Sequence, residues 1–302
     1  APVCCPSRAA VMSGLLPSTS GIYNNGHWWK PNLPKLVTLP EHFRNNGYLA
    51  VGAGKIFHHT AGNNPPAIWD EYHRLVFNDD AFSRSAGRYL TLYPYTKHQP
   101  VPEEFPYSGI TLYSPEVDWG VLPKKEGEMD DYQTVKFCTD FMARKHAMPF
   151  FLACGIFHPH LPWYVPRKYL DLYPVDQVQL PEVLREDLND VPQAGQKMAL
   201  RKNQDLEKVR AAKKWKPAVA HYLASITYAD ARVGQLLKGL DQSGYAKNTI
   251  IVLWSDHGWH FGEKEHWHKR TLWEVCTRVP FIVVAPGIGK SRQVSRQPVS
   301  LI

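Results

Sequence analysis

The sequence predicts an α/β fold in which a largely parallel sheet carries helices on both faces. Short apolar runs typical of buried strands alternate with helical stretches, and polar motifs follow directly after several of these runs. With 302 residues, the chain is long enough to bury a large core. Because sites in open α/β sheets form beyond the carboxyl ends of the strands, the polar motifs are the candidates for function.

The first part of the chain predicts two helices and one strand. Pro6 can open a helix that continues over residues 8–15, and Thr38 precedes a second, capped helix over residues 39–44. The apolar run over residues 48–53 predicts a short buried strand. By contrast, residues 60–130 are rich in Pro, Gly, Tyr and Asn with little periodicity, so we expect long loops there, the usual place for specificity elements.

The remainder of the chain alternates helices and strands. Two stretches predict helices and three apolar runs predict strands: residues 130–144 and 219–240, then residues 149–155, 249–254 and 279–284. Lys55, His160 and Asp256 each follow a predicted strand at its carboxyl end. We therefore expect three chemically useful groups from distant parts of the sequence to converge on one rim of the sheet.

Composition excludes some classes of protein and leaves others open. The five cysteines are odd in number and scattered, without a CxxC pair, which argues against a disulfide framework and a structural zinc site. No apolar run approaches the ~20 residues of a membrane span. The net charge of +7 favours anionic partners, but nucleic-acid binding rests on charge alone. The basic run over residues 197–216 is typical of a solvated helix face.

The strongest motif lies at the beginning of the chain. Cys4-Cys5-Pro6-Ser7-Arg8 has the form C-x-P-S-R and resembles the signature of the type I sulfatases. In that family a dedicated enzyme oxidises the first cysteine to formylglycine. Pro and Arg stand two and four residues after Cys4, whereas Ser and Ala hold those places after Cys5, so the pattern selects Cys4.

Three further segments resemble the same family, in the same order along the chain. Lys55 and His58 are separated by two residues, a spacing found in the iduronate-2-sulfatase branch. The strand over 149–155 leads into the loop that carries His160, and Ser255-Asp256-His257-Gly258 follows the strand over 249–254, with Lys269 further on. The resemblance covers almost the whole chain, thinly between residues 60 and 130.

The resemblance implies a fold, a domain organisation and a role for each matching residue. We expect an alkaline-phosphatase-like fold, with residues 1–302 as part of one catalytic domain and a loop-rich specificity insertion at about 60–130. The resemblance implies that Cys4 becomes the formylglycine nucleophile and that Cys4, Asp256 and His257 bind Ca²⁺, with Mg²⁺ possible. It implies that Arg8 and Lys55 hold the nucleophile and that His58 accepts a proton. It also implies that His160 and Lys269 bind sulfate oxygens and that one of them protonates the leaving oxygen.

One departure from the family concerns the cation. The family carries an Asp-Asp pair on a strand before the C-x-P-S-R motif, and Asp79-Asp80 and Asp130-Asp131 stand in the wrong order to replace it. We therefore expect a fragment or processed chain, without the family's N-terminal strand and C-terminal subdomain.

The implied partners are a sulfated carbohydrate and the formylglycine-generating enzyme, and the implied location is secreted, periplasmic or lysosomal. Two alternatives stay open: a phosphonate or phosphate ester hydrolase of the same superfamily, and a non-catalytic protein that binds sulfated glycans.

Overall fold

The structure is a computed structural model that describes residues 2–58, 63–73, 75–78, 88–91, 106–113, 117–123, 125–200, 204–288 and 293–302, with backbone only for 75–78, 88–91 and 204. Its helices are α1 Cys4–Ser13, α2 Pro17–Ser20, α3 Trp29–Asn32, α4 Leu39–Asn45, α5 Asp130–Met142, α6 Arg167–Leu170, α7 Gln193–Ala199, α8 Gln204–Ala211, α9 Trp215–Ser243 and α10 Glu274–Thr277. Its strands are β1 Leu49–Gly54, β2 Glu71–His73, β3 Leu75–Asn78, β4 Arg88–Thr91, β5 Trp119–Val121, β6 Phe150–Gly155, β7 Trp163–Val165, β8 Ile251–Trp254, β9 His260–Phe261, β10 Trp267–His268 and β11 Phe281–Val284.

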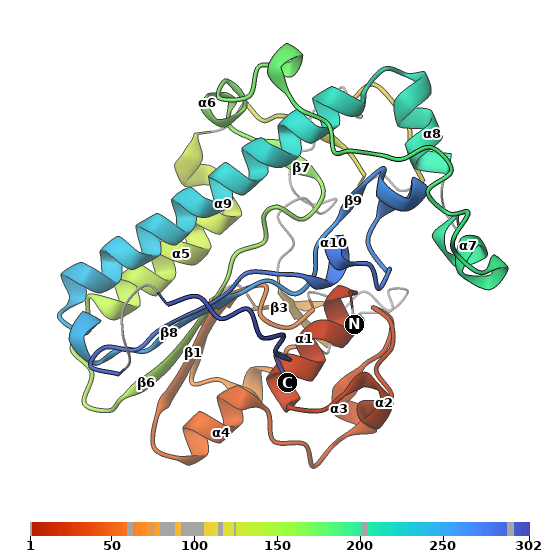
Figure 1. The fold of residues 1–302 in the computed structure, drawn as a ribbon. Helices are drawn as coiled ribbons and strands as arrows, with labels where there is room; N and C mark the ends of the chain where they lie inside the picture. The colour runs from red at the N-terminus through yellow and green to blue at the C-terminus, as the bar shows by residue number, and fades with distance from the viewer. Residues whose placement is uncertain are drawn as a thin grey trace.

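The centre of the fold is a three-stranded parallel sheet in the order β2-β1-β6. A parallel sheet needs both faces covered, and two sets of helices do this, with α1 and α4 on one face and α5 and α9 on the other (Figure 1). The side chains alternate accordingly: Ala50 and Phe151 pack toward α1, while Val51 and Leu152 pack toward α5 and α9. The predicted arrangement of helices around a parallel sheet is confirmed.

Strand β8 continues the same layer without hydrogen bonds to β6 among the described residues. Trp254 of β8 joins the apolar cluster on the α1 face, and Ile251 joins the cluster on the α5 face. The last predicted strand, β11, pairs with β8 antiparallel, so the parallel part of the sheet is β2-β1-β6. Antiparallel pairing leaves β11 at an edge, where its four apolar side chains are about half exposed.

A second layer of elements lies beyond the carboxyl ends of these strands. The short parallel pair β5-β7 and the antiparallel pair β9-β10 pack with α8 and α9 around a core of large aromatic side chains, including the fully buried Trp163 and Trp267. The stretch predicted as long loops contains β2, β3, β4 and β5 among its described residues. Asp79 and Asp80 lie outside the described residues.

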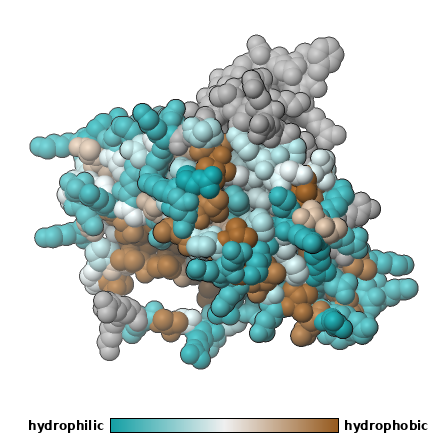
Figure 2. Space-filling view, turned by 90° about the horizontal axis from the view of Figure 1, so that it is seen from above, coloured by the Kyte–Doolittle hydropathy of each residue, from teal (hydrophilic) through white to brown (hydrophobic). Residues whose placement is uncertain are grey.

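The hydropathy of the surface varies from place to place. Figure 2 shows brown, apolar side chains gathered in patches between hydrophilic ones on the face seen from above. In the part of the chain that the structure describes, no helix combines the length and the hydropathy that crossing a membrane requires.

Candidate active site at the carboxyl ends of the strands

The first turn of α1 and the ends of three strands meet at one place. Cys4 begins α1, Lys55 follows β1, His160 lies in the loop after β6, and Asp256 lies two residues after the end of β8. Glycine makes the approach of β1 and β6 possible, because a Cβ atom at Gly54 would lie 2.2 Å from the carbonyl oxygen of Gly155. The sequence therefore brings its predicted polar groups to one rim, as expected for an open α/β sheet.

Nitrogen atoms from three residues surround the sulfur of Cys4. The distances to Sγ are 2.9 Å from Lys269 Nζ, 3.2 Å from His257 Nε2 and 3.8 Å from Lys55 Nζ. Lys269 Nζ also lies 3.3 Å from His160 Nε2 and 3.1 Å from His257 Nε2. Five of the residues singled out in the sequence therefore form one cluster, although they span residues 4 to 269.

Arg8 joins the three chain segments that build the cluster. It lies one helical turn after Cys4, its Nε donates to Asp256 Oδ2 at 2.8 Å, and its guanidinium donates to the backbone oxygens of Lys55 and Ile56. Ser7 adds a bond from its Oγ to the Asp256 carbonyl at 2.7 Å. The signature pentapeptide thus fixes both neighbouring strand ends through two of its own side chains.

The two adjacent cysteines have opposite electrostatic surroundings. Burial alone would raise the pKa of Cys4, but the ammonium groups of Lys55 and Lys269 outweigh it, and together with the neighbouring His160 and His257 they lower the pKa well below its ordinary value. Burial, together with the nearby Cys4, raises the pKa of Cys5 to about 12. Cys5 instead packs against α3 and directs its thiol toward the His27 carbonyl oxygen. Both thiols are fully buried, and of the two it is Cys4 that has the electropositive surroundings of a reactive thiol.

The other titratable groups of the cluster are tuned by burial. Burial and the two lysines lower the pKa of His160 to about 3, and burial with the charge of Lys55 does the same for His58. Burial also lowers the pKa of Lys55 to about 8, although the Cys4 thiolate opposes it. Both histidines are therefore neutral at neutral pH and can act as proton acceptors.

Three residues offer ligand atoms to a cation. One atom each from Cys4, Asp256 and His257 lies within 4.8 Å of the other two. His257 Nδ1 donates to the Gly258 carbonyl at 2.9 Å, so its Nε2 keeps the lone pair that a metal needs. Burial would raise the pKa of Asp256, but Arg8 and His257 outweigh it and hold the value at about 2, so the carboxylate stays ionised. The carboxylate suits a hard divalent cation, whereas a thiolate and an imidazole suit softer ions, and one carboxylate is few for Ca²⁺.

The loop that carries His160 is held by a buried carboxylate that the sequence did not reveal. Asp131 of α5 accepts bonds from the backbone amides of Phe157 and His158, at 2.7 and 3.0 Å, and from His158 Nδ1 at 2.6 Å. The Phe157 ring then lies 4.5 Å below Lys55 Nζ and 4.8 Å from the His160 ring. From the sequence, Asp131 was considered only as part of the Asp130-Asp131 pair, which comes too late in the chain to replace the family's metal-binding pair.

The segment that carries Lys269 is also held under strain. The residues on either side, His268 and Arg270, have φ angles of 90° and 80°, which side chains with a Cβ rarely adopt. The fully buried Asp205 of α8 accepts from His268 Nε2 at 2.8 Å, and His266 bonds to the Lys269 carbonyl at 3.0 Å. Such outliers persist where surrounding contacts fix them, and here they turn Lys269 toward Cys4.

Comparisons with a family model and with curated proteins point to the same family. The family model described as Sulfatase matches residues 1–302. A sulfatase of Formosa agariphila is 36% identical over 316 residues, with 100% of this chain and 58% of the relative covered. Human iduronate 2-sulfatase is 30% identical over 303 residues, with 94% of this chain and 52% of the relative covered. The chain therefore spans about half the length of these curated relatives.

Solved structures agree on the fold. A phosphonate monoester hydrolase from Silicibacter pomeroyi superposes with a TM-score of 0.68 at 21% identity, over 94% of this chain and 59% of the other. At this level of identity the likeness concerns the fold alone, and that fold is the alkaline-phosphatase-like one expected from the sequence.

Proposed function

The chain belongs to the sulfatase family, and on that premise we propose that it hydrolyses sulfate monoesters of a sulfated carbohydrate, with its nucleophile at position 4. The observation that carries the proposal is the cluster of lysine and histidine nitrogens within 3.8 Å of Cys4 Sγ. A sulfate ester is anionic and has a poor leaving group, so its cleavage requires positive charge, a strong nucleophile and a proton donor. The cluster offers the charge and the proton donor around the atom where the nucleophile would form.

The nucleophile depends on a modification of Cys4 by the formylglycine-generating enzyme. Hydrated formylglycine supplies one hydroxyl that attacks sulfur and a second whose deprotonation expels sulfate afterwards, and a divalent cation lowers the pKa of the attacking hydroxyl. The Cys4 Sγ atom stands where these oxygens would lie, so Lys55 and Lys269 would donate to them. Arg8 would act through Asp256 and the backbone after β1, to which it is bonded.

The hydrogen bonds of His160 indicate which group carries the proton for the leaving oxygen. His160 Nδ1 donates to the Leu161 carbonyl at 2.7 Å, so in the neutral ring Nε2 carries no proton. Lys269 Nζ lies 3.3 Å from this nitrogen and, as an amine, is the hydrogen-bond donor of the pair. Lys269 would therefore be the general acid that protonates the leaving oxygen, and His160 would accept a hydrogen bond from it. His58 would take the proton released when sulfate departs.

The cation would be held by Asp256 Oδ, His257 Nε2 and the oxygens at position 4, with Ca²⁺ preferred over Mg²⁺ by resemblance to the family. The Asp-Asp pair on the family's preceding strand would complete the ligand set. The iduronate-2-sulfatase-like branch is supported by the Lys55-to-His58 spacing and by the 30% identity to the human enzyme of that name. The secreted, periplasmic or lysosomal location stays a prediction.

The test compares two esters of one sugar. The intact protein, made together with the formylglycine-generating enzyme, should release sulfate from a 2-O-sulfated uronate with a kcat/KM well above that for the matching phosphate ester. A preference for the phosphate ester or a phosphonate would favour the alternative hydrolase. An unmodified Cys4 in the peptide mass spectrum, with binding but no turnover, would favour the non-catalytic glycan-binding protein.

A further inference from the structure

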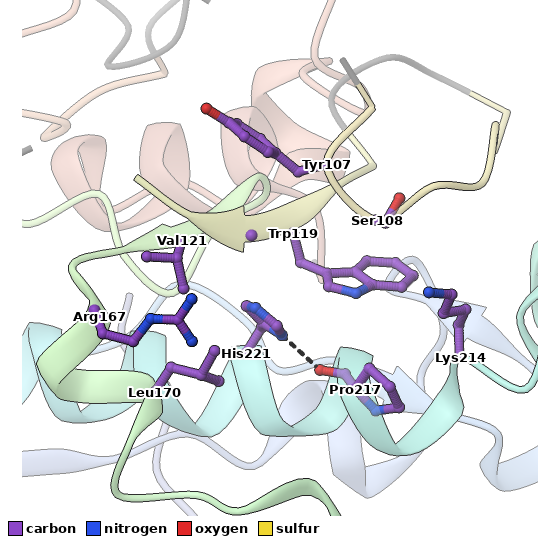
Figure 3. A pocket seen from close by; sticks show the side chains of 10 residues that line it. Tyr107, Ser108, Trp119, Val121, Arg167, Leu170, Lys214, Pro217 and His221 are labelled. Carbon is purple, nitrogen blue, oxygen red and sulfur yellow. Dashed lines mark hydrogen bonds between the residues drawn. The ribbon is translucent and has the colours of Figure 1, made fainter. Parts of the chain in front are cut away.

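A second cavity lies away from the cluster around Cys4. It has a volume of about 370 Å³ and lies between β5, α6 and the first turns of α9 (Figure 3). None of its lining residues belongs to the candidate active site. The volume falls within the range of about 300–1,000 Å³ that is typical of small-ligand sites.

The polar lining of this cavity is basic. Arg167, Lys214 and His221 line it, and no acidic side chain does so among the described residues. Neither Arg167 nor Lys214 forms an ion pair or side-chain hydrogen bond with any part of the chain that the structure describes. In Figure 3, Arg167 and His221 point toward each other at one end, and Lys214 lies beside the Trp119 ring at the other. The two ends therefore offer separate cationic groups to one ligand.

His221 presents a free nitrogen to the same space. Its Nδ1 donates to the Pro217 carbonyl at 2.8 Å, which leaves Nε2 without a partner among the described residues. Burial lowers the pKa of His221, with Arg167 adding to the effect and the Pro217 bond and Asp118 opposing it. In the neutral ring Nε2 carries no proton, so it would accept a hydrogen bond from a sugar hydroxyl, while Arg167 binds the anionic group.

The cavity walls are held rigidly, as a binding site requires. The fully buried Asp118, directly before β5, accepts the backbone amides of Tyr107 and Ser108, each at 2.9 Å, and the Tyr164 hydroxyl. These bonds occupy the Asp118 carboxylate and attach the 107–108 turn to β5, which pairs with β7. Hydrogen bonds and strand pairing therefore tie together one wall of the cavity.

The chemistry of the lining defines the class of ligand. Arginine binds oxyanions through two parallel hydrogen bonds, and a lysine at the opposite end suits a second anionic group. Val121 and Leu170 add an apolar wall, which matches the carbon face of a sugar ring better than a bare ion. Lys208, Arg210 and Lys213 continue the positive charge along α8 and the turn before α9, where they are exposed.

We propose that this cavity is a second carbohydrate site, which holds a sulfate or carboxylate group of a polyanionic sugar chain away from the bond that is cleaved. The inference rests on the proposed function for the class of substrate. It gives Lys214, which the sequence placed in a solvated basic run, a specific contact. The site would raise affinity for long chains and leave the chemistry at position 4 unchanged.

The first experiment measures binding to the intact protein with Cys4→Ala, so that the ligand is not consumed. Isothermal titration with a heparin decasaccharide should show Kd raised about tenfold or more by Arg167→Ala with Lys214→Ala. The matched control is Lys238→Ala with Lys247→Ala, which removes the same charge from exposed positions near the other end of α9. The control should stay within about twofold. Equal affinities for the two double variants would overturn the proposal.

The second experiment separates a carbohydrate from a free ion. The NMR signal of the His221 ring, assigned with His221→Gln, should shift on addition of the decasaccharide and saturate at its Kd. Sodium sulfate at equal sulfate concentration, in matched ionic strength, should not saturate it. Saturation by sulfate alone with the same affinity would assign the cavity to an inorganic ion and overturn the carbohydrate assignment.

The third experiment distinguishes this proposal from the proposed function. In matured protein, the Arg167→Ala and Lys214→Ala double variant should raise KM for a sulfated polymer and leave kcat/KM for a sulfated monosaccharide within about twofold. An equal loss on both substrates would contradict a separate site. If unsubstituted protein cleaved neither substrate, the proposed function would fail, and the binding measurements would still decide the role of the cavity.

Discussion

At the scale of single residues, two neighbouring thiols are set apart by the side chains that face them. Cys4 points at two ammonium groups and a histidine, while Cys5 points into the core beside α3. A thiolate reacts with electrophiles and a thiol does not, so the difference in pKa becomes a difference in reactivity.

This difference can be measured in protein made without the modifying enzyme. Iodoacetamide at pH 7 should alkylate Cys4 at least tenfold faster than Cys5, because the pKa of the Cys4 thiol is lowered and that of the Cys5 thiol is raised. Peptide mass spectrometry over time gives both rates in one sample. Lys269→Ala should slow the reaction at Cys4, since it removes a charge 2.9 Å from the sulfur. Equal rates at both cysteines would contradict the assigned surroundings.

Lys55 illustrates a cost of function at one residue. Burial lowers its pKa from 10.5 to about 8. Below pH 8 Lys55 is therefore charged in both states, and its charge is less favourable in the folded protein than in the unfolded chain. This destabilisation of the folded state is fully present below pH 8 and disappears as the pH rises from 8 to 10.5. Lys55→Met should therefore raise the free energy of unfolding at pH 7 by up to ~3 kcal/mol, with a smaller gain at pH 10.

Urea denaturation of metal-free, unmodified protein at both pH values measures this effect. The matched control is Lys35→Met, which should change stability by less than ~0.5 kcal/mol at either pH because Lys35 is exposed. In matured protein, Lys55→Met should lose most of its turnover. A variant that was less stable than the unsubstituted protein at pH 7 would show that the Lys55 charge stabilises the fold.

At the scale of elements, α5 supports the active site from behind the sheet. Asp131 reaches over the end of β6 and binds the loop of residues 157–160, which lies against Lys55 and carries His160. Asp131 and His158 are both almost fully buried, so breaking their pair leaves an uncompensated group in the interior. The helix thus positions a loop that it does not belong to.

Asp131→Asn should destabilise the protein by ~3 kcal/mol or more and lower kcat for sulfate release, because an amide nitrogen cannot accept the bonds that the carboxylate accepts. Asp140→Asn on the same helix is the control, since Asp140 is exposed and pairs with Lys136. That change should cost less than ~1 kcal/mol. Assays well below the unfolding temperature separate the two effects, and a kcat that Asp131→Asn left unchanged would refute the positioning role.

Local sequence patterns predicted the helices and strands that carry the site, but they did not predict the long-range contacts between them. The helix over 130–144 and the strand over 149–155 follow from local apolar spacing and were found as α5 and β6. The contact of Asp131 with residues 157 and 158 has no sequence pattern, because a buried acid bonded to loop amides looks like any helical Asp. The antiparallel pairing of β11 with β8 could not be predicted either, because an apolar run does not specify its partner strand or its direction.

At the scale of the whole molecule, the sheet is open between β6 and β8. All six residues of β6 are only half-buried although most are apolar, and β8 lacks a hydrogen-bonded neighbour on that side among the described residues. Among the described residues, Asp256 is the one carboxylate grouped with Cys4 and His257, which is few for calcium.

The cation prediction follows from that ligand set. Removing metal from the intact, matured protein with EDTA should abolish sulfate release, and Ca²⁺ should restore it. Asp256→Asn should raise the Ca²⁺ concentration for half-maximal activity at least tenfold, because it replaces a charged ligand by a neutral one. Full activity in EDTA after prolonged dialysis would contradict a cation-dependent mechanism.

The most direct measurement is sulfate release by three matured proteins on one sulfated sugar: unsubstituted, Cys4→Ala and Cys5→Ala. The contacts around Cys4 Sγ predict that Cys4→Ala loses hydrolysis by at least 10³-fold, whereas Cys5→Ala keeps much of it. Ion chromatography of released sulfate gives the rates, and circular dichroism checks that all three fold. Turnover by Cys4→Ala at the unsubstituted rate would contradict the central claim that position 4 carries the nucleophile.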